Sequence, residues 1–166
     1  RIGGAQAIAA MAYGTQSIPK VSKIFGPGNQ FVTTAKMLVF GEVDIDMPAG
    51  PSEVAVIADE TARPAWVAAD LLSQLEHGTD SQAVLITNSA GVAHAIVREM
   101  KLQIQRLPRR DIIRQSMKQS YAVVARSLEE MCRIANEYAP EHLEIVARDE
   151  QKILSRINNA GSIFLG

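Results

Sequence analysis

The sequence contains one cysteine, few aromatic residues and no excess of either charge. A single cysteine in 166 residues excludes an internal disulfide framework and is typical of a reducing compartment. Seventeen basic and eighteen acidic residues leave a formal charge of -1, so no overall field steers the chain to nucleic acid or an anionic membrane. No apolar run is long enough to span a bilayer, and no secretory signal is visible. We therefore expect a cytoplasmic protein that binds neither nucleic acid nor a membrane.

Nearly half of the residues are hydrophobic, which is enough to bury a sizeable core in one domain or two small lobes. Short stretches that are mostly apolar predict strands over residues 21–25, 54–58, 83–87, 121–124, 143–146 and 162–165. Helices are expected over residues 5–13, 30–39, 89–107, 111–118, 127–138 and 151–158, with one more that begins at Pro64 and carries Trp66 toward a core. This alternation predicts an α/β fold of Rossmann-like parallel sheet layers with helices on both faces.

Both ends of the sequence indicate a piece of a longer protein. The chain begins at Arg1, close to a predicted helix and without an initiator methionine, and it stops at Gly166 directly after an apolar strand. We therefore expect incomplete lobes.

The turn Gly26-Pro27-Gly28-Asn29 joins a predicted strand to a helix, where open parallel sheets bind ligands. Its glycines permit close backbone approach, and Asn29 can contact a polar ligand or cap its own helix, which is the commoner role. The sequence has neither a G-x-G-x-x-G fingerprint nor a P-loop, so a dinucleotide site here would be atypical.

A second turn, Ala49-Gly50-Pro51-Ser52-Glu53, precedes a predicted buried strand. Such a turn holds its side chains rigidly and can present Ser52 or Glu53 to a substrate. Ordinary turns greatly outnumber sites, so this motif alone is weak.

Gln74 and His77 are spaced three residues apart near the end of a predicted helix, so their side chains share a face and can converge on one atom. An imidazole is a good zinc ligand, whereas a glutamine oxygen is a neutral and less usual one. A catalytic zinc takes three protein ligands or more, so the others would come from outside this chain or from the substrate. His77 can equally well neutralise the helix C-terminus. The residues alone leave both interpretations open.

Glu141 and His142 form a carboxylate and imidazole pair on a connection that Pro140 stiffens. A histidine held there can take protons near neutral pH while the carboxylate acts as a second base. An exposed charged turn is the simpler interpretation, and the pair precedes a strand, whereas sites in open sheets usually follow strands. We expect His94 on a helix face and Cys132 as a small packed hydrophobe rather than a nucleophile.

Together, these residues resemble the histidinol dehydrogenase family. The motifs occur in family order over the whole chain: Gly3-Gly4-Ala5-Gln6-Ala7, Phe25-Gly26-Pro27-Gly28-Asn29, Ile45-Asp46, Ala49-Gly50-Pro51-Ser52-Glu53, Asp70-Leu71-Leu72-Ser73-Gln74, Glu76-His77-Gly78, Pro140-Glu141-His142-Leu143 and Gly161-Ser162-Ile163-Phe164-Leu165-Gly166. The block from Ile45 to His77 is the most specific, because several spaced motifs must coincide in it.

The resemblance implies oxidation of L-histidinol through L-histidinaldehyde to L-histidine, with two NAD+, a water and a zinc ion. It implies that Gln74 and His77 are zinc ligands that also contact the substrate, as Ser52 and His142 would. His142 would take the alcohol proton as hydride leaves for NAD+, and Glu141 would activate water for attack on the aldehyde.

The resemblance also implies that Gln6 and Asn29 contact NAD. Family chains are well over twice this length and form homodimers, and their other two zinc ligands lie beyond the end of this sequence. We therefore expect residues 1–50 to be the C-terminal part of one Rossmann-like lobe and residues 51–166 the second half of another. The chain alone is expected neither to turn over histidinol nor to bind zinc tightly. The alternatives are an NAD-dependent dehydrogenase of another amino alcohol and a non-catalytic α/β module.

Overall fold

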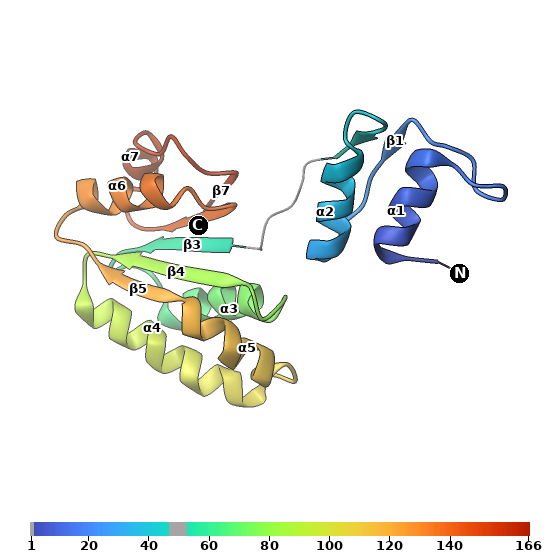
Figure 1. Ribbon diagram of the computed structural model, residues 1–166. Helices are drawn as coiled ribbons and strands as arrows, with labels where there is room; N and C mark the ends of the chain where they lie inside the picture. The colour runs from blue at the N-terminus through green and yellow to red at the C-terminus, as the bar shows by residue number, and fades with distance from the viewer. Residues whose placement is uncertain (1, 47–52) are drawn as a thin grey trace. The chain divides into compact units, whose positions relative to one another are not determined.

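The computed structural model describes residues 2–46 and 53–166 (Figure 1). The chain divides into two compact units, Arg1–Pro51 and Ser52–Gly166. Each unit has its own sheet and its own hydrophobic core, so each is treated by itself.

The first unit is a small βαβ unit with one additional helix. It contains α1 (Gly4–Tyr13), β1 (Lys23–Ile24), α2 (Gln30–Val39) and β2 (Asp44–Ile45). The two strands pair in parallel, and α2 is the crossover between them. The helices pack side by side over a core that contains Ile8, Ala12, Ile24, Val39 and Val43.

The second unit is built on a parallel five-stranded sheet. Its strands are β3 (Glu53–Ala58), β4 (Gln82–Thr87), β5 (Tyr121–Val124), β6 (His142–Val146) and β7 (Ser162–Leu165). They lie in the order β5-β4-β3-β6-β7, and every neighbouring pair is parallel. The order reverses between β3 and β6, as in doubly wound folds. Because strands with both faces covered read as unbroken apolar runs, the sequence predicted this α/β architecture correctly.

Helices cover both faces of this sheet (Figure 1). They are α3 (Pro64–Leu75), α4 (Ala90–Gln103), α5 (Arg110–Ser116), α6 (Leu128–Tyr138) and α7 (Glu150–Leu154), with 3-10 turns at Ile104–Arg106 and Met117–Gln119. The first three pack on one face, and α6 and α7 pack on the other. Alternate strand residues divide between the two cores: Val54 and Val56 face α3, and Ala55 and Ile57 face α6.

The helix expected over residues 151–158 is shorter in the structure. It ends at Leu154, because Asn136 of α6 binds the backbone that follows. The Asn136 amide donates to the Arg156 carbonyl at 2.8 Å and accepts the N–H groups of Asn158 and Asn159 at 2.7 and 3.1 Å. A side chain distant in sequence therefore ends this helix.

Two further expectations differ from the structure, one in the length of a strand and one in the burial of a side chain. The strand expected over residues 21–25 is reduced to Lys23–Ile24, because its only partner among the described residues is the two-residue β2. Trp66, expected to face a core, is 63% exposed, and the Arg63 guanidinium carbon lies 4.4 Å from its ring centroid. The indole is thus covered by a cation rather than by apolar side chains.

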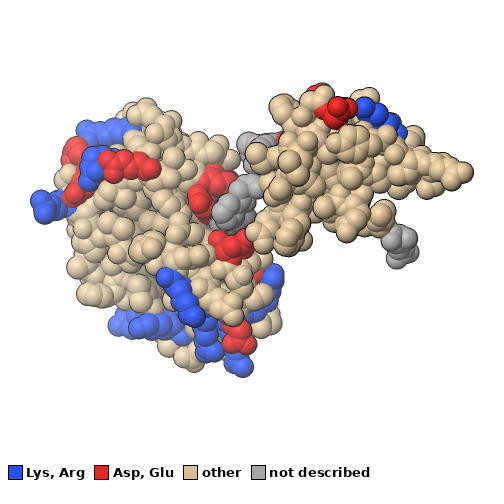
Figure 2. Space-filling view, in the orientation of Figure 1, with Lys and Arg blue, Asp and Glu red and all other residues tan. Residues whose placement is uncertain are grey.

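The surface carries both signs of charge in mixed groups on the face that Figure 2 shows. No helix in residues 2–46 and 53–166 has the length and apolar character required to cross a membrane.

Candidate active site

Glu141 and His142 lie where α6 leads into β6. Ala139 ends α6 in the left-handed conformation, with a φ of 51°, and Pro140 is buried. The sharp change of direction brings both side chains to the N-terminal end of the sheet, beside the start of β3. Both side chains are half-buried, so the simpler interpretation of an exposed charged turn does not hold.

The segment before β7 holds this corner from the other side. The N–H groups of Gly161 and Ser162 donate to the carbonyls of Pro140 and Glu141 at 3.0 and 2.9 Å. A Cβ at position 161 would lie 2.6 Å from the Glu141 carbonyl oxygen, so only glycine fits there without a shift. The backbone of the pair is therefore fixed by close packing.

The two side chains are neighbours without a hydrogen bond between them. His142 Nδ1 lies 3.9 Å from Glu141 Oε2, beyond hydrogen-bond range. That carboxylate oxygen is buried and has no hydrogen-bond partner in the described part of the chain. The His142 ring lies 6.0 Å from the Phe164 ring, centroid to centroid. Each group is therefore able to act on a bound molecule independently of the other.

The surroundings of the pair disfavour further negative charge. Burial, and then the Glu141 carboxylate, raise the pKa of Glu53 above its usual range. Burial, and then the Glu53 charge, raise the pKa of Tyr138 to about 12, and its hydroxyl donates to Gln82 Oε1 at 2.6 Å. This end of the sheet suits a cation or a proton donor.

Gln74 and His77 lie at the same edge of the sheet. Because α3 connects the parallel strands β3 and β4, it runs antiparallel to them and ends at their N-terminal edge. Gln74 is 9% exposed, and its Nε2 is buried with no hydrogen-bond partner among the described residues. His77 is exposed, and its N–H donates to the Gln74 carbonyl at 3.2 Å. An unpaired buried N–H group is costly, so Nε2 lacks a hydrogen-bond acceptor among the described residues.

These two side chains fit part of a zinc site. An imidazole and an amide near one helix end match the residue types of the two predicted ligands, and zinc would bind the Gln74 amide oxygen rather than its unpaired Nε2. Within residues 2–46 and 53–166, no group of three or more His, Cys, Asp and Glu side chains is placed to hold a metal ion. A zinc bound by Gln74 and His77 would therefore require ligands from outside the described residues.

A carboxyl pair that no sequence motif indicated lies beside this site. Glu144 lies on the α3-facing side of β6, two residues after His142, and Asp70 lies one helical turn before Gln74. Burial raises the pKa of Asp70, and burial followed by the Asp70 charge raises the pKa of Glu144 to about 7. The available signal was a glutamate between the apolar residues Leu143 and Ile145 of a predicted strand.

The other predicted site residues belong to the first unit or are not described. Ser52 lies outside the described residues. Asn29 is the N-cap of α2, where its Oδ1 accepts the Val32 N–H at 3.2 Å, so the capping interpretation is confirmed. Gln6 is exposed in the first turn of α1. The two helices begin at the same end of the pair (Figure 1), so Gln6 and Asn29 lie toward the same end of this unit.

The usual ligand position of a doubly wound sheet is filled by the chain itself. At the C-terminal ends of β3 and β6, the Asp59 carboxylate accepts the N–H groups of Thr61 and Arg148 at 2.8 and 2.9 Å. The candidate site therefore lies at the opposite edge from the one that fold rules favour.

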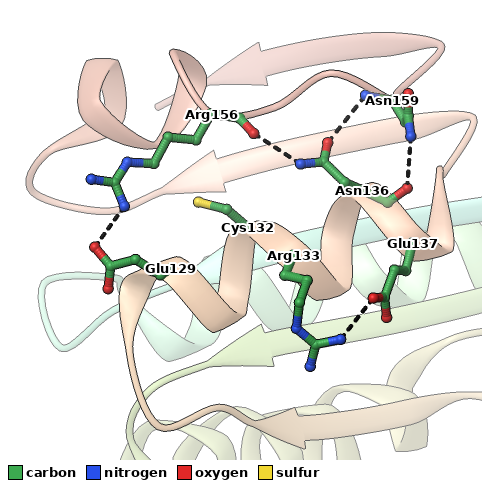
Figure 3. Close-up of a pocket in the computed structure, with 7 residues that line it drawn as sticks. All are labelled: Glu129, Cys132, Arg133, Asn136, Glu137, Arg156 and Asn159. Carbon is green, nitrogen blue, oxygen red and sulfur yellow. Dashed lines mark hydrogen bonds and ion pairs between the residues drawn. The ribbon is translucent and has the colours of Figure 1, made fainter.

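In a hollow beside α6, the charged side chains that line it pair with one another (Figure 3). Arg156 pairs with Glu129 at 2.6 Å, and Arg133 pairs with Glu137 at 2.7 Å. Cys132 is buried, and burial raises the pKa of its thiol, so its predicted role as a packed hydrophobe is confirmed. His94, expected on a helix face, is exposed on α4.

Known proteins resemble this chain along its whole length. A family model described as histidinol dehydrogenase matches residues 1–166. Histidinol dehydrogenases from Bacteroides fragilis (strain YCH46) and Streptococcus mutans serotype c are 57% and 56% identical over 100% of this chain. The match covers 39% of each relative, so the chain spans about two fifths of their length.

Solved structures agree in fold. Histidinol dehydrogenase from Elizabethkingia anophelis matches with a TM-score of 0.95 and 49% identity, over 100% of this chain and 39% of that one. Gamma-glutamyl phosphate reductase from Thermotoga maritima matches with a TM-score of 0.59 and 12% identity, over 96% of this chain and 44% of that one, which shows likeness of fold alone. Since the family model covers every residue and the relatives share more than half of them, this chain belongs to the histidinol dehydrogenase family.

Proposed function

We propose that this chain is part of an enzyme that oxidises L-histidinol through L-histidinaldehyde to L-histidine, in histidine biosynthesis, with two NAD+ and a zinc ion. Family membership supports the reaction class. The observation that carries the proposal is the gathering of Glu141, His142 and the unpaired amide of Gln74 at one edge of a sheet.

In the first oxidation, His142 would take the proton of the substrate hydroxyl as the carbon loses its hydride, for which NAD+ would be the acceptor. A half-buried imidazole at a fixed backbone corner suits this role, because a neutral imidazole nitrogen can accept a proton from a hydroxyl within hydrogen-bond reach. The product is the aldehyde, a reduced cofactor and a protonated imidazole.

In the second oxidation, Glu141 takes a proton from water as the water oxygen attacks the aldehyde carbon. The hydrate would then lose its hydride, for which a second NAD+ would be the acceptor, and the resulting carboxylic acid would release its proton to solvent. The unpaired Oε2 of Glu141 supports this role, because that lone pair is not engaged by any described residue. The distance of 3.9 Å to His142 Nδ1 lets the two bases act on different atoms of one substrate.

Gln74 and His77 would hold the zinc together with ligands from outside this chain. Zinc would orient the substrate through its amino and imidazole groups. Ser52 would contact the substrate. The carboxyl groups around this edge favour an amino alcohol, which carries a positive charge.

Gln6 and Asn29 would contact NAD in the first unit. The turn before Asn29 follows β1 and opens α2, which is where dinucleotides bind in βαβ units. In this proposal, residues 1–50 complete one Rossmann-like lobe and residues 51–166 form the second half of another. The working enzyme is a cytoplasmic homodimer.

The test uses the full-length protein with two variants and a control. His142→Asn should slow NADH formation from histidinol, and Glu141→Gln should slow NADH formation from histidinaldehyde, each by a factor of about 100 or more. His94→Asn, which changes an exposed histidine on α4, should leave both rates unchanged. Wild-type rates in both site variants would refute the assignment.

Two further measurements bound the proposal. A substrate panel with added zinc separates histidinol from other amino alcohols. The chain of residues 1–166 alone should produce no NADH, because its described residues supply only two of the zinc ligands. Robust turnover by that chain would contradict the proposal.

A further inference from the structure

An ion pair between buried Lys36 and partly exposed Asp46 encloses the peptide groups of Gly26 in the first unit. Lys36 of α2 is 4% exposed, although lysine is rarely buried. Its Nζ donates to the Gly26 carbonyl at 3.0 Å and pairs with the Asp46 carboxylate. The other Asp46 oxygen accepts the Gly26 N–H at 2.8 Å. We call this closed ring of Gly26, Lys36 and Asp46 the Gly26 clasp.

The Gly26 clasp fixes one end of the turn that leads to Asn29. Gly26 has a φ of 138°, which side-chain-bearing residues rarely adopt. At the other end, Asn29 caps α2 through the Val32 N–H. A turn with two glycines has many accessible conformations, so the clasp and the cap together select one of them.

The chemistry of the clasp indicates a role in shape rather than in charge. Burying an ion pair is energetically expensive, and apolar residues of similar volume often stabilise a fold as well. The Lys36 charge is already neutralised by Asp46, and the Lys36 hydrogen bond lowers the pKa of Asp46 so that it stays ionised. What the pair adds is the orientation of both peptide groups of Gly26.

We propose that Lys36 and Asp46 are positioning residues for NAD binding, which act by holding the Gly26–Asn29 turn in its binding conformation. The inference rests on the proposed function, in which this turn receives the cofactor. Its alternative is direct attraction of the NAD phosphates by the Lys36 ammonium. The positioning role and the direct attraction predict opposite results for a variant that removes only the Asp46 carboxylate. If the clasp positions the turn, the variant binds NAD more weakly; if Lys36 attracts the phosphates, the unpaired ammonium binds NAD more tightly.

The test is a fluorescence titration of the full-length protein with NADH. Lys36→Met and Asp46→Asn should each weaken NADH binding about tenfold, because binding must then also offset the conformational entropy lost when the turn becomes ordered. At saturating NAD+, kcat for histidinol should stay within about threefold of wild type, so that the effect appears in KM for NAD+. Glu42→Gln is the matched control, since it breaks only an exposed ion pair with Lys20 at 3.5 Å in the same unit.

A double variant, Lys36→Met with Asp46→Leu, guards against unfolding because it leaves no buried charge unpaired. Circular dichroism and thermal melting verify its fold, and it should bind NADH as weakly as the single variants. Folded variants that bind NADH within about twofold of wild type would overturn the positioning role of the Gly26 clasp and leave the proposed function standing. Tighter binding by Asp46→Asn would do the same. A wild-type protein that binds no NADH would overturn the proposed function as well.

Discussion

Replacing Glu144 with glutamine should stabilise the second unit above neutral pH and change little in acid. Burial, and then the Asp70 charge, raise the pKa of Glu144 from 4.5 to about 7. The folded state therefore binds this proton more tightly than the unfolded state does. Its contribution is full below pH 4.5 and is lost as the pH rises through about 7.

The size of the effect follows from the shift. At about 1.4 kcal/mol per pKa unit, the change corresponds to roughly 3 kcal/mol as an upper limit. Because Glu144 is only half-buried, solvent screening reduces this to about 1 to 2 kcal/mol. Glutamine has nearly the same shape and cannot ionise, so the Glu144→Gln variant should be more stable than wild type by that amount at about pH 8.

Urea unfolding of the 166-residue chain at a series of pH values measures this difference. The single tryptophan, Trp66, lies in the same unit as Glu144, so its fluorescence reports the unfolding of that unit. Glu129→Gln is the control, because the Arg156 hydrogen bond lowers the pKa of Glu129 to about 2. Near neutral pH this carboxylate is ionised in both the folded and the unfolded state, so its loss changes the free energy of unfolding by an amount that does not vary with pH there. A difference between wild type and Glu144→Gln that is constant with pH would refute the reasoning.

Three further outcomes are expected. Gly161→Ala should reduce the free energy of unfolding by about 1 to 3 kcal/mol, because the new Cβ would lie 2.6 Å from the Glu141 carbonyl oxygen. Calorimetry would show this as a lower melting temperature. Ser116→Ala should cost about 1 to 3 kcal/mol in urea unfolding, since the buried Ser116 hydroxyl donates to the Leu75 carbonyl at 2.8 Å. Cys132 should react with iodoacetamide far more slowly in the folded than in the unfolded chain, measured by mass spectrometry, because burial raises the pKa of its thiol. A melting temperature, an unfolding free energy or an alkylation rate that stays unchanged would contradict the corresponding prediction.

The sheet of the second unit was predictable because its strands are buried on both faces. Residues 54–58 and 83–86 read as unbroken apolar runs, which amphipathic helices do not. The two-residue strand Asp44–Ile45 has no periodicity to detect, and only its pairing with β1 defines it. The end of α7 depends on Asn136, twenty residues before Arg156, so no local pattern encodes it.

The candidate site was predictable only where chemistry is concentrated in short motifs. Glu141 and His142 are adjacent in sequence, and one helical turn separates Gln74 from His77. Glu144 on β6 and Asp70 on α3 are far apart in sequence, so their proximity could not be predicted before the topology of the sheet was known. Lys36 was hidden for the same reason, because a buried lysine looks like any helical lysine until its partners are known.

Helix direction explains why anionic and cationic ligands suit different parts of this chain. A helix carries partial positive charge at its N-terminus and partial negative charge at its C-terminus. The Gly26–Asn29 turn opens α2, so it suits the phosphates of a dinucleotide. Gln74 ends α3 at an edge that also gathers Glu141 and Glu144, so it suits a metal cation and a protonated amine. In the proposed enzyme, each ligand thus meets the helix end of opposite sign, although the second edge is not where doubly wound sheets usually bind.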